Sequence, residues 1–277
     1  MFSISDFIKS FRQPAVMGIV NASGDSFSEQ DSAAESALDR ALQLLDDGAD
    51  LLDLGGESTR PGAVPVTPDE EIARVIPVLK KIKSLRPAVI CSIDTRNAAT
   101  ARAALDAGAE IINDVSMLRN APEIAQITAE YQVSMILTHS RGRPENMMAP
   151  ANCFYPQGVA LTAASEIAEA EKFAINAGVK KENILLDPGF GFAKTAGQCW
   201  ELAKELEKFS PPSRILAGVS RKSFLGELTG EKNPAARDSA TLALELDFAA
   251  RKVAVIRTHA VRDLRHGLQV QLKLQGT

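Results

Sequence analysis

The amino-acid sequence predicts an α/β protein folded as a single (β/α)8 TIM barrel over residues 1–277, with a short N-terminal helix. Three observations predict this fold. Short apolar runs recur eight times along the chain, each run ends at a polar residue, and a helical segment follows. A run that is apolar on both faces is typical of a strand buried between helices. Eight such units in series are the pattern of a closed barrel.

The eight runs consist mainly of branched or aliphatic residues and stop at a polar side chain. In chain order they cover residues 16–20, 51–54, 89–93, 111–112, 135–138, 184–186, 215–219 and 253–256. In this fold the carboxyl ends of all strands face the same side, where active sites are built. The polar residues that follow the runs are therefore expected to converge in one cleft, although they lie far apart in the sequence.

The segments between the runs have the periodicity of amphipathic helices. Residues 1–11 place apolar side chains at helical spacing and predict a helix that covers the bottom of the barrel. Thr67, Pro68 and the acidic residues after them predict a helix start. Further helices are predicted over residues 32–46, 97–107 and 160–177, the last two ended by Gly108 and Gly178.

Composition and charge narrow the range of functions. The net charge of −4 argues against a protein that grips nucleic acid with a basic face. No run reaches the roughly 18 apolar residues of a membrane-spanning helix. Three cysteines at no metal-binding spacing predict free thiols, with Cys91 buried in a strand, and suit a reducing compartment. We therefore expect a cytoplasmic protein that holds any anionic substrate with a local basic cluster.

Four polar side chains follow strands three, four, six and seven: Asp94, Asn113, Asp187 and Lys222. They suit a heterocycle with a guanidine-like edge, because a carboxylate accepts two parallel N–H bonds from such an edge. Each residue taken alone could instead cap a strand end or pair with a helix. Since all four fall at matching positions, the sequence favours a binding site for such a ring.

A second group, Asn21, Arg60, Arg257 and His259, offers an amide and three potential cations. This group suits a phosphate or pyrophosphate beside the ring. Arg60 could also be a solvated loop charge, and His259 a hydrogen-bonded core histidine. The chain has only three histidines, and His139 also follows a strand, which is suggestive of a role at the cleft.

These residues lie in motifs that resemble dihydropteroate synthase, the pterin-binding barrel enzyme of folate biosynthesis. The similarity covers nearly the whole chain in the family's order. Its most specific parts are GGESTRPG at 55–62 and SRKS at 220–223. The other matches are residues 17–21, 25–28, 92–95 and 111–114, DPGFGF at 187–192, and residues 257–259.

The resemblance implies a transferase that condenses 6-hydroxymethyl-7,8-dihydropterin pyrophosphate with 4-aminobenzoate, giving 7,8-dihydropteroate and pyrophosphate. It also implies Mg2+ as cofactor, a homodimer, and a target of sulfonamides, which mimic 4-aminobenzoate. The implied site residues are, for catalysis, Asp94, Asp25, Lys222 and Arg257; for the pterin, Asp94, Asn113, Asp187, Lys222 and Arg257; for pyrophosphate, Asn21, Arg60, Arg257 and His259; for the metal, Asn21; and for 4-aminobenzoate, Phe27, Thr59, Pro61, Phe190 and Ser220.

Three departures from the family pattern accompany these matches. Ser23-Gly24 stands where the family usually has Thr-Pro, Ala260 stands where Asp is frequent, and residues 139–142 read HSRG in place of a His-Met-Lys-Gly type stretch. None of them removes a residue expected to hold the pterin. Two alternative functions share this grip: a methyltetrahydrofolate-dependent methyltransferase and a non-catalytic pterin-binding paralogue. The methyltransferase gives no reason for the basic group described above, so the synthase is favoured.

Overall fold

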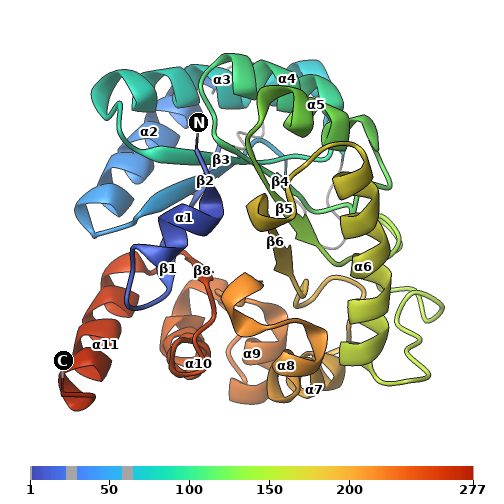
Figure 1. Cartoon of the computed structure of the whole chain (residues 1–277). Coiled ribbons are helices and arrows are strands. Elements are labelled where there is room, and N and C mark those ends of the chain that lie inside the picture. The colour runs from blue at the N-terminus through green and yellow to red at the C-terminus, as the bar shows by residue number, and fades with distance from the viewer. Residues whose placement is uncertain (1, 23–29, 58–64, 277) are drawn as a thin grey trace.

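The computed structural model describes residues 2–22, 30–57 and 65–276 of the chain. Its eight parallel strands form one sheet in the order β6-β5-β4-β3-β2-β1-β8-β7, and a parallel bridge between Leu186 and Ile215 joins the two edges into a barrel. The helices surround the strands (Figure 1), so the predicted architecture is confirmed. The strands are β1 Ala15–Asn21, β2 Leu51–Gly55, β3 Ile90–Asp94, β4 Ile111–Asp114, β5 Ser134–Thr138, β6 Ile184–Asp187, β7 Leu216–Ala217 and β8 Val255–Thr258.

The helix predicted from Thr67 and Pro68 begins at its capping residue. At the predicted start, Thr67 Oγ1 accepts from Glu70 N at 3.3 Å and Glu70 Oε2 accepts from Thr67 N at 2.8 Å, a capping box. The helices are α1 Ile4–Lys9, α2 Gln30–Asp46, α3 Pro68–Leu85, α4 Ala98–Asp106, α5 Glu123–Tyr131, α6 Val159–Asn176, α7 Ala196–Lys204, α8 Leu206–Phe209, α9 Ser223–Thr229, α10 Asp238–Ala250 and α11 Val261–Leu274.

Strand side chains alternate between two apolar cores. Met17 and Leu51 point inward and belong to the core that fills the lower barrel. Leu52 and Ile93 point outward and pack in the larger core between the strands and the helices. Because successive residues of a strand point to opposite faces, both faces must be apolar. This double burial explains why the strands read as unbroken apolar runs.

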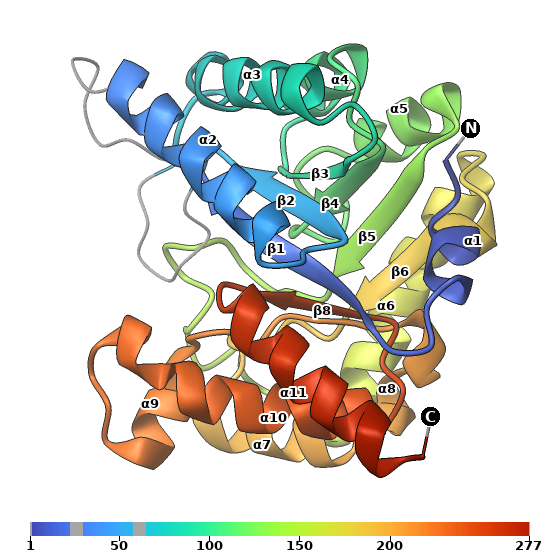
Figure 2. The same ribbon diagram turned by 90° about the vertical axis from the view of Figure 1, so that its left-hand side faces the viewer.

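Helix α1 covers the end of the barrel at which the strands start (Figure 2). Ile4 is fully buried in the inner core, and its N–H donates to Ser134 Oγ at the start of β5 at 3.1 Å. Ser3 Oγ donates to Asn183 Oδ1, just before β6, at 2.8 Å. The predicted position of the N-terminal helix is confirmed. Helix α1 therefore closes this end of the barrel, and the carboxyl ends of the strands lie at the opposite end.

Strand β7 is shorter than the apolar run that predicted it. Only Leu216 and Ala217 pair along the strand, although the run extends over residues 215–219. The chain turns early, because Lys222 N donates to Val219 O at 3.2 Å and Arg221 has a φ of +60°. The last residues of the run therefore lead into the turn before α9.

Two predictions from composition can also be compared with the structure. Cys91 is a free, buried thiol in β3, and burial raises its pKa to about 12, which confirms the expected inert cysteine. Within the described ranges, no helix is both long and apolar enough to cross a lipid bilayer.

Candidate active site

The inner face of the barrel changes from apolar to charged toward the carboxyl ends of the strands. The alternation that points Leu51 into the lower core also points Asp53, Asp94 and Arg257 inward. Arg257 Nε donates to Asp53 Oδ2 at 2.6 Å, and Arg257 Nη2 donates to Asp94 Oδ2 at 3.1 Å. Asn113 Nδ2 donates to Asp53 Oδ2 at 3.1 Å. One guanidinium on β8 therefore links two carboxylates on β2 and β3, and Asn113 on β4 joins them.

This charged wall has more acceptors than the protein itself satisfies. Burial, together with the nearby Asp53 charge, raises the pKa of Asp94, while Arg257 opposes the rise. Buried polar atoms almost always have a hydrogen-bond partner, so unpaired ones mark places where a polar ligand or an ordered water can bind. Among the described residues, no partner is found for Asp53 Oδ1, Ser92 Oγ, Asp94 Oδ1, Asn113 Oδ1 and Thr138 Oγ1.

Asp187 and Lys222 complete the wall on its other side. Asp187 Oδ1 accepts from Gly189 N at 2.7 Å. Lys222 Nζ donates to Phe190 O and lies 4.4 Å from the centroid of the Phe192 ring. Burial lowers the pKa of Lys222 to about 8, against the attraction of the Asp187 carboxylate. The four residues predicted to hold the ring therefore lie at one end of the barrel, and their contacts with a pterin stay predictions.

His259 lies beside a cluster of guanidinium groups at the end of β8. Its Nδ1 is 2.9 Å from Ser220 Oγ, and its carbonyl accepts from Arg40. Burial, then the charges of Arg221, Arg257 and Arg40, lowers the pKa of His259 to about 3. The sequence suggested a third cation at this position. The structure favours a neutral imidazole instead, because burial and the charges of three neighbouring guanidinium groups disfavour its protonated form.

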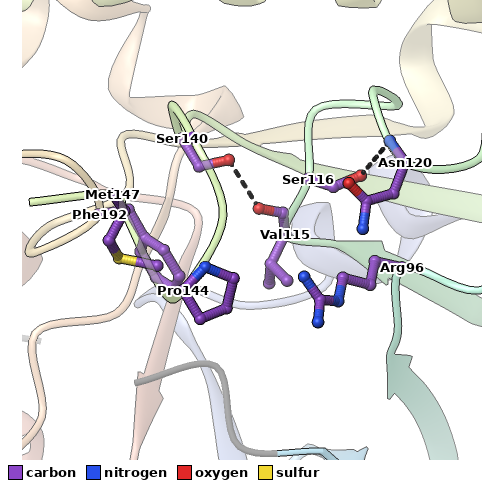
Figure 3. Close-up of a pocket in the computed structure, with 9 residues that line it drawn as sticks. Arg96, Val115, Ser116, Asn120, Ser140, Pro144, Met147 and Phe192 are labelled. Carbon is purple, nitrogen blue, oxygen red and sulfur yellow. Dashed lines mark hydrogen bonds between the residues drawn. The ribbon is translucent and has the colours of Figure 1, made fainter. Parts of the chain in front are cut away.

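The side chain of Phe190 does not face the cleft, which corrects its predicted contact with 4-aminobenzoate. It is fully buried, and its ring stacks on Phe224 and Phe248 with centroids 6.0 and 5.7 Å away. Two residues later the DPGFGF turn points Phe192 to the cleft side, over Lys222. Phe192 also lines a pocket whose other walls are shown in Figure 3. Phe192, and not Phe190, is therefore the candidate aromatic residue for contact with 4-aminobenzoate.

Asn21 ends β1 with an exposed side chain, level with Gly55 and, through it, with Asp94. The described residues contain no cluster of three or more His, Cys, Asp or Glu side chains that could hold a metal ion. The predicted residues Asp25, Phe27, Thr59, Arg60 and Pro61, and Gly24, lie outside the described residues.

Sequence reasoning missed Asp53 as part of the site. It lies in the middle of β2, is fully buried, and accepts from both Arg257 and Asn113. The available signal was an acidic residue inside a run that is otherwise apolar on both faces. Such a residue is rarely buried unless a partner compensates its charge.

His139, at the end of β5, belongs to a second buried network. Its Nδ1 is 2.8 Å from Lys194 Nζ, and its Nε2 is 3.1 Å from Glu166 Oε2. Arg141 Nε donates to Glu166 Oε2 at 2.9 Å. Lys194 Nζ also donates to the carbonyl oxygens of residues 189 and 192, both at 3.1 Å. This network joins the loops after β5 and β6 and leaves neither ring nitrogen of His139 free.

Comparison with known proteins identifies the family of the chain. The family model described as "Pterin binding enzyme" matches residues 17–259. Dihydropteroate synthase of Streptococcus pyogenes serotype M3 is 39% identical over 252 residues, which cover 90% of this chain and 91% of that protein. The folic acid synthesis protein fol1 of Schizosaccharomyces pombe is 36% identical over 95% of this chain, which spans only 37% of that longer protein.

Solved structures give the same result. Dihydropteroate synthase of Xanthomonas albilineans with 4-aminobenzoic acid superposes with a TM-score of 0.85 at 37% identity, over 96% of this chain and 94% of that one. A structure of the same enzyme in complex with 7,8-dihydropteroate has a TM-score of 0.82 at 34% identity, over 96% and 94% of the two chains. The chain therefore belongs to the pterin-binding enzyme family and, within it, to the dihydropteroate synthases.

Proposed function

We propose that this chain condenses 6-hydroxymethyl-7,8-dihydropterin pyrophosphate with 4-aminobenzoate to give 7,8-dihydropteroate and pyrophosphate. The amine nitrogen forms a bond to the pterin methylene carbon, the bond from that carbon to the pyrophosphate oxygen breaks, and the amine loses a proton to solvent. The reaction is a group transfer that needs no protein nucleophile. The protein's task is to hold the pterin, to stabilise the leaving pyrophosphate and to position the amine.

The observation that carries this proposal is the polar wall around Arg257. Its unpaired oxygens on Asp94 and Asn113 are acceptors in a buried place, and Asp187 adds a further carboxylate. A pterin presents a row of N–H donors along its guanidine-like edge, which such acceptors can satisfy. As positive charge develops on the methylene, an ionised Asp94 becomes more favourable, so this residue is the proposed stabiliser of that charge.

The leaving group would be held by Arg257, His259 and Asn21, with Arg60 as a further proposed ligand by resemblance. For Mg2+, Asn21 would supply one oxygen, and the ion suits a site with few protein ligands because it retains waters and binds substrate phosphates. When bound, the metal neutralises charge on the departing pyrophosphate. Arg257 and His259 contribute to the same end with a fixed charge and a hydrogen bond.

The test is a pyrophosphate-release assay with the pterin pyrophosphate, with and without 4-aminobenzoate and with EDTA. We expect release to depend on 4-aminobenzoate, to yield 7,8-dihydropteroate and to stop in EDTA. Asp187→Asn should weaken pterin binding by about 10- to 100-fold, because an amide N–H would face an N–H edge. Asp106→Asn, on the exposed face of α4, is the matched control. Release without 4-aminobenzoate, or wild-type pterin affinity in Asp187→Asn by calorimetry, would contradict the assignment.

The resemblance also supports two further proposals, that the protein is a homodimer and that it is cytoplasmic. Sedimentation at several concentrations measures the first, and fractionation of cells that express the chain measures the second. A monomer at all concentrations would reject the dimer.

A further inference from the structure

A chain of three buried or half-buried hydroxyl and carboxyl groups leads from helix α10 to the ring of His259. Glu245 on α10 is buried next to Thr258, and its Oε1 has no hydrogen-bond partner among the described residues. Thr258 Oγ1 is 3.5 Å from Ser220 Oγ, and Ser220 Oγ is 2.9 Å from His259 Nδ1. In the described part of the chain, the other ring nitrogen of His259 has no hydrogen-bond partner. Within the described ranges the ring is therefore held through Nδ1 alone.

The number of hydrogens and lone pairs on each hydroxyl determines which group donates in this series of hydrogen bonds. Ser220 Oγ accepts from His259 N at 3.1 Å, and Thr258 Oγ1 is placed to donate to it. A hydroxyl has one hydrogen and two lone pairs, so with both lone pairs used its own hydrogen must go to His259 Nδ1. A nitrogen that accepts a hydrogen bond carries no proton. The proton of the neutral ring then sits on Nε2.

The direction depends on Glu245. Thr258 Oγ1 accepts from Ala260 N at 3.2 Å and donates toward Ser220, so its remaining lone pair suits a donor. A protonated Glu245 is such a donor, whereas an ionised one would draw the Thr258 hydrogen away and reverse the chain. Glu245 is almost fully buried, and its Oε1 has no partner among the described residues. Burial raises the pKa of Glu245 to about 8, although a hydrogen bond from Thr258 to the carboxylate would lower it, so burial favours the protonated form near neutral pH.

We propose that Glu245, Thr258 and Ser220 are positioning residues that fix His259 as the neutral tautomer with its proton on Nε2, and so aim one N–H donor at the leaving pyrophosphate. The identity of the anion rests on the proposed function, and the tautomer does not. A neutral donor suits this place, since Arg40 on α2, Arg221 in the turn before α9 and Arg257 on β8 already supply positive charge. Asp238 on α10 is the acidic neighbour, and it is paired with Arg221 by two bonds of 2.7 Å.

The test reads the tautomer directly by 15N NMR of protein labelled at histidine nitrogens, without ligand. The chain has three histidines, so His259→Gln assigns the signals of His259. We expect the Nε2–H tautomer in the unsubstituted protein and a mixture of tautomers in Ser220→Ala and in Thr258→Val. Thr128→Val is the matched control, because Thr128 is a buried threonine on α5 that donates to Ile124 O at 2.7 Å. It should leave the His259 signals unchanged.

Inorganic pyrophosphate is the probe for the consequence. We expect Thr258→Val to raise its dissociation constant about tenfold and to leave the affinity for free pterin unchanged, while Thr128→Val changes neither. An Nδ1–H tautomer in the unsubstituted protein would overturn the proposal, and so would an Nε2–H tautomer that persists in both Ser220→Ala and Thr258→Val. If the enzyme failed to turn over the pterin pyrophosphate, the NMR result would still stand, so the two failures are distinguishable.

Discussion

His139 and His259 occupy equivalent positions in the sequence but differ in the hydrogen bonding of their rings. Each follows a barrel strand, β5 or β8, and burial lowers the pKa of each to about 3. Both ring nitrogens of His139 are bonded, to Lys194 and Glu166. His259 is bonded through Nδ1 alone, to Ser220, and its Nε2 has no partner within the described ranges. Both ring nitrogens of His139 are therefore used within the protein, whereas Nε2 of His259 can donate to a ligand.

The comparison teaches that a polar residue at a strand end is not by itself a site residue. What separates the two histidines is the set of groups packed behind them. Glu166 behind His139 is ionised, because hydrogen bonds from His139 and Arg141 overcome the effect of burial and lower its pKa to about 2. Glu245 behind His259 is buried without a cation, which raises its pKa to about 8. A paired carboxylate therefore anchors one ring and a protonated carboxyl aligns the other.

The largest expected difference concerns stability. His139→Ala should lower the free energy of unfolding by about 2–3 kcal/mol, because the buried Lys194 loses a hydrogen-bond acceptor and Glu166 loses one of its donors. His259→Ala should lower it by only about 1 kcal/mol, since one hydrogen bond to Ser220 is lost at a half-open place. Urea unfolding followed by circular dichroism measures both. Equal losses in the two variants would break the comparison, because both histidines would then be structural.

The next effect is the pH dependence of stability in Glu166→Gln and Glu245→Gln. The folded-state pKa of Glu166 is lowered, so its contribution is present above about pH 4.5 and is lost as the pH falls toward 2. The folded-state pKa of Glu245 is raised, so its contribution is full below about pH 4.5 and is lost as the pH rises through about 8.

Glu166→Gln should therefore be most destabilising near neutral pH, and Glu245→Gln should become more favourable relative to the unsubstituted protein from pH 4.5 to 8. Urea unfolding at intervals across this range measures both differences. Parallel curves for the two variants would mean that the two glutamates have the same charge state. In that case Glu245 could not donate to Thr258.

Much of the fold could be predicted because strands buried on both faces leave a strong pattern. The runs located all eight strands, and the polar residues after them located the wall formed by Asp94, Asn113, Asp187 and Arg257. A helix start such as Thr67-Pro68 was predictable because its hydrogen bonds are local. These features depend on neighbours within a few residues of the sequence.

The remaining features depend on packing between distant segments. Asp53 joins the wall only because Arg257, 204 residues away in sequence, reaches it. Phe190 and Phe192 are equivalent in a sequence motif, and only the direction of the turn after β6 sends one ring to the core and the other to the cleft. The charge of His259 could not be predicted, since it depends on burial and on arginines from three separate segments.

The smallest expected effect concerns pyrophosphate binding, and we expect the contribution of His259 to this binding to be independent of pH. A histidine cation would strengthen pyrophosphate binding at low pH and lose that effect as the pH rises through about 6.5. Neutral His259 donates the same N–H bond throughout this range. His259→Gln should therefore weaken pyrophosphate binding by about tenfold or less, by a factor that stays constant from about pH 5.5 to 7.5.

The measured quantity is the ratio of the pyrophosphate dissociation constants of His259→Gln and the unsubstituted protein. This ratio cancels the ionisation of pyrophosphate itself, which is the same for both proteins. Calorimetric titration at several pH values gives this ratio. A ratio that falls toward one as the pH rises would show that His259 binds as a cation, and the contrast with His139 would then lie in its charge as well as in its free nitrogen.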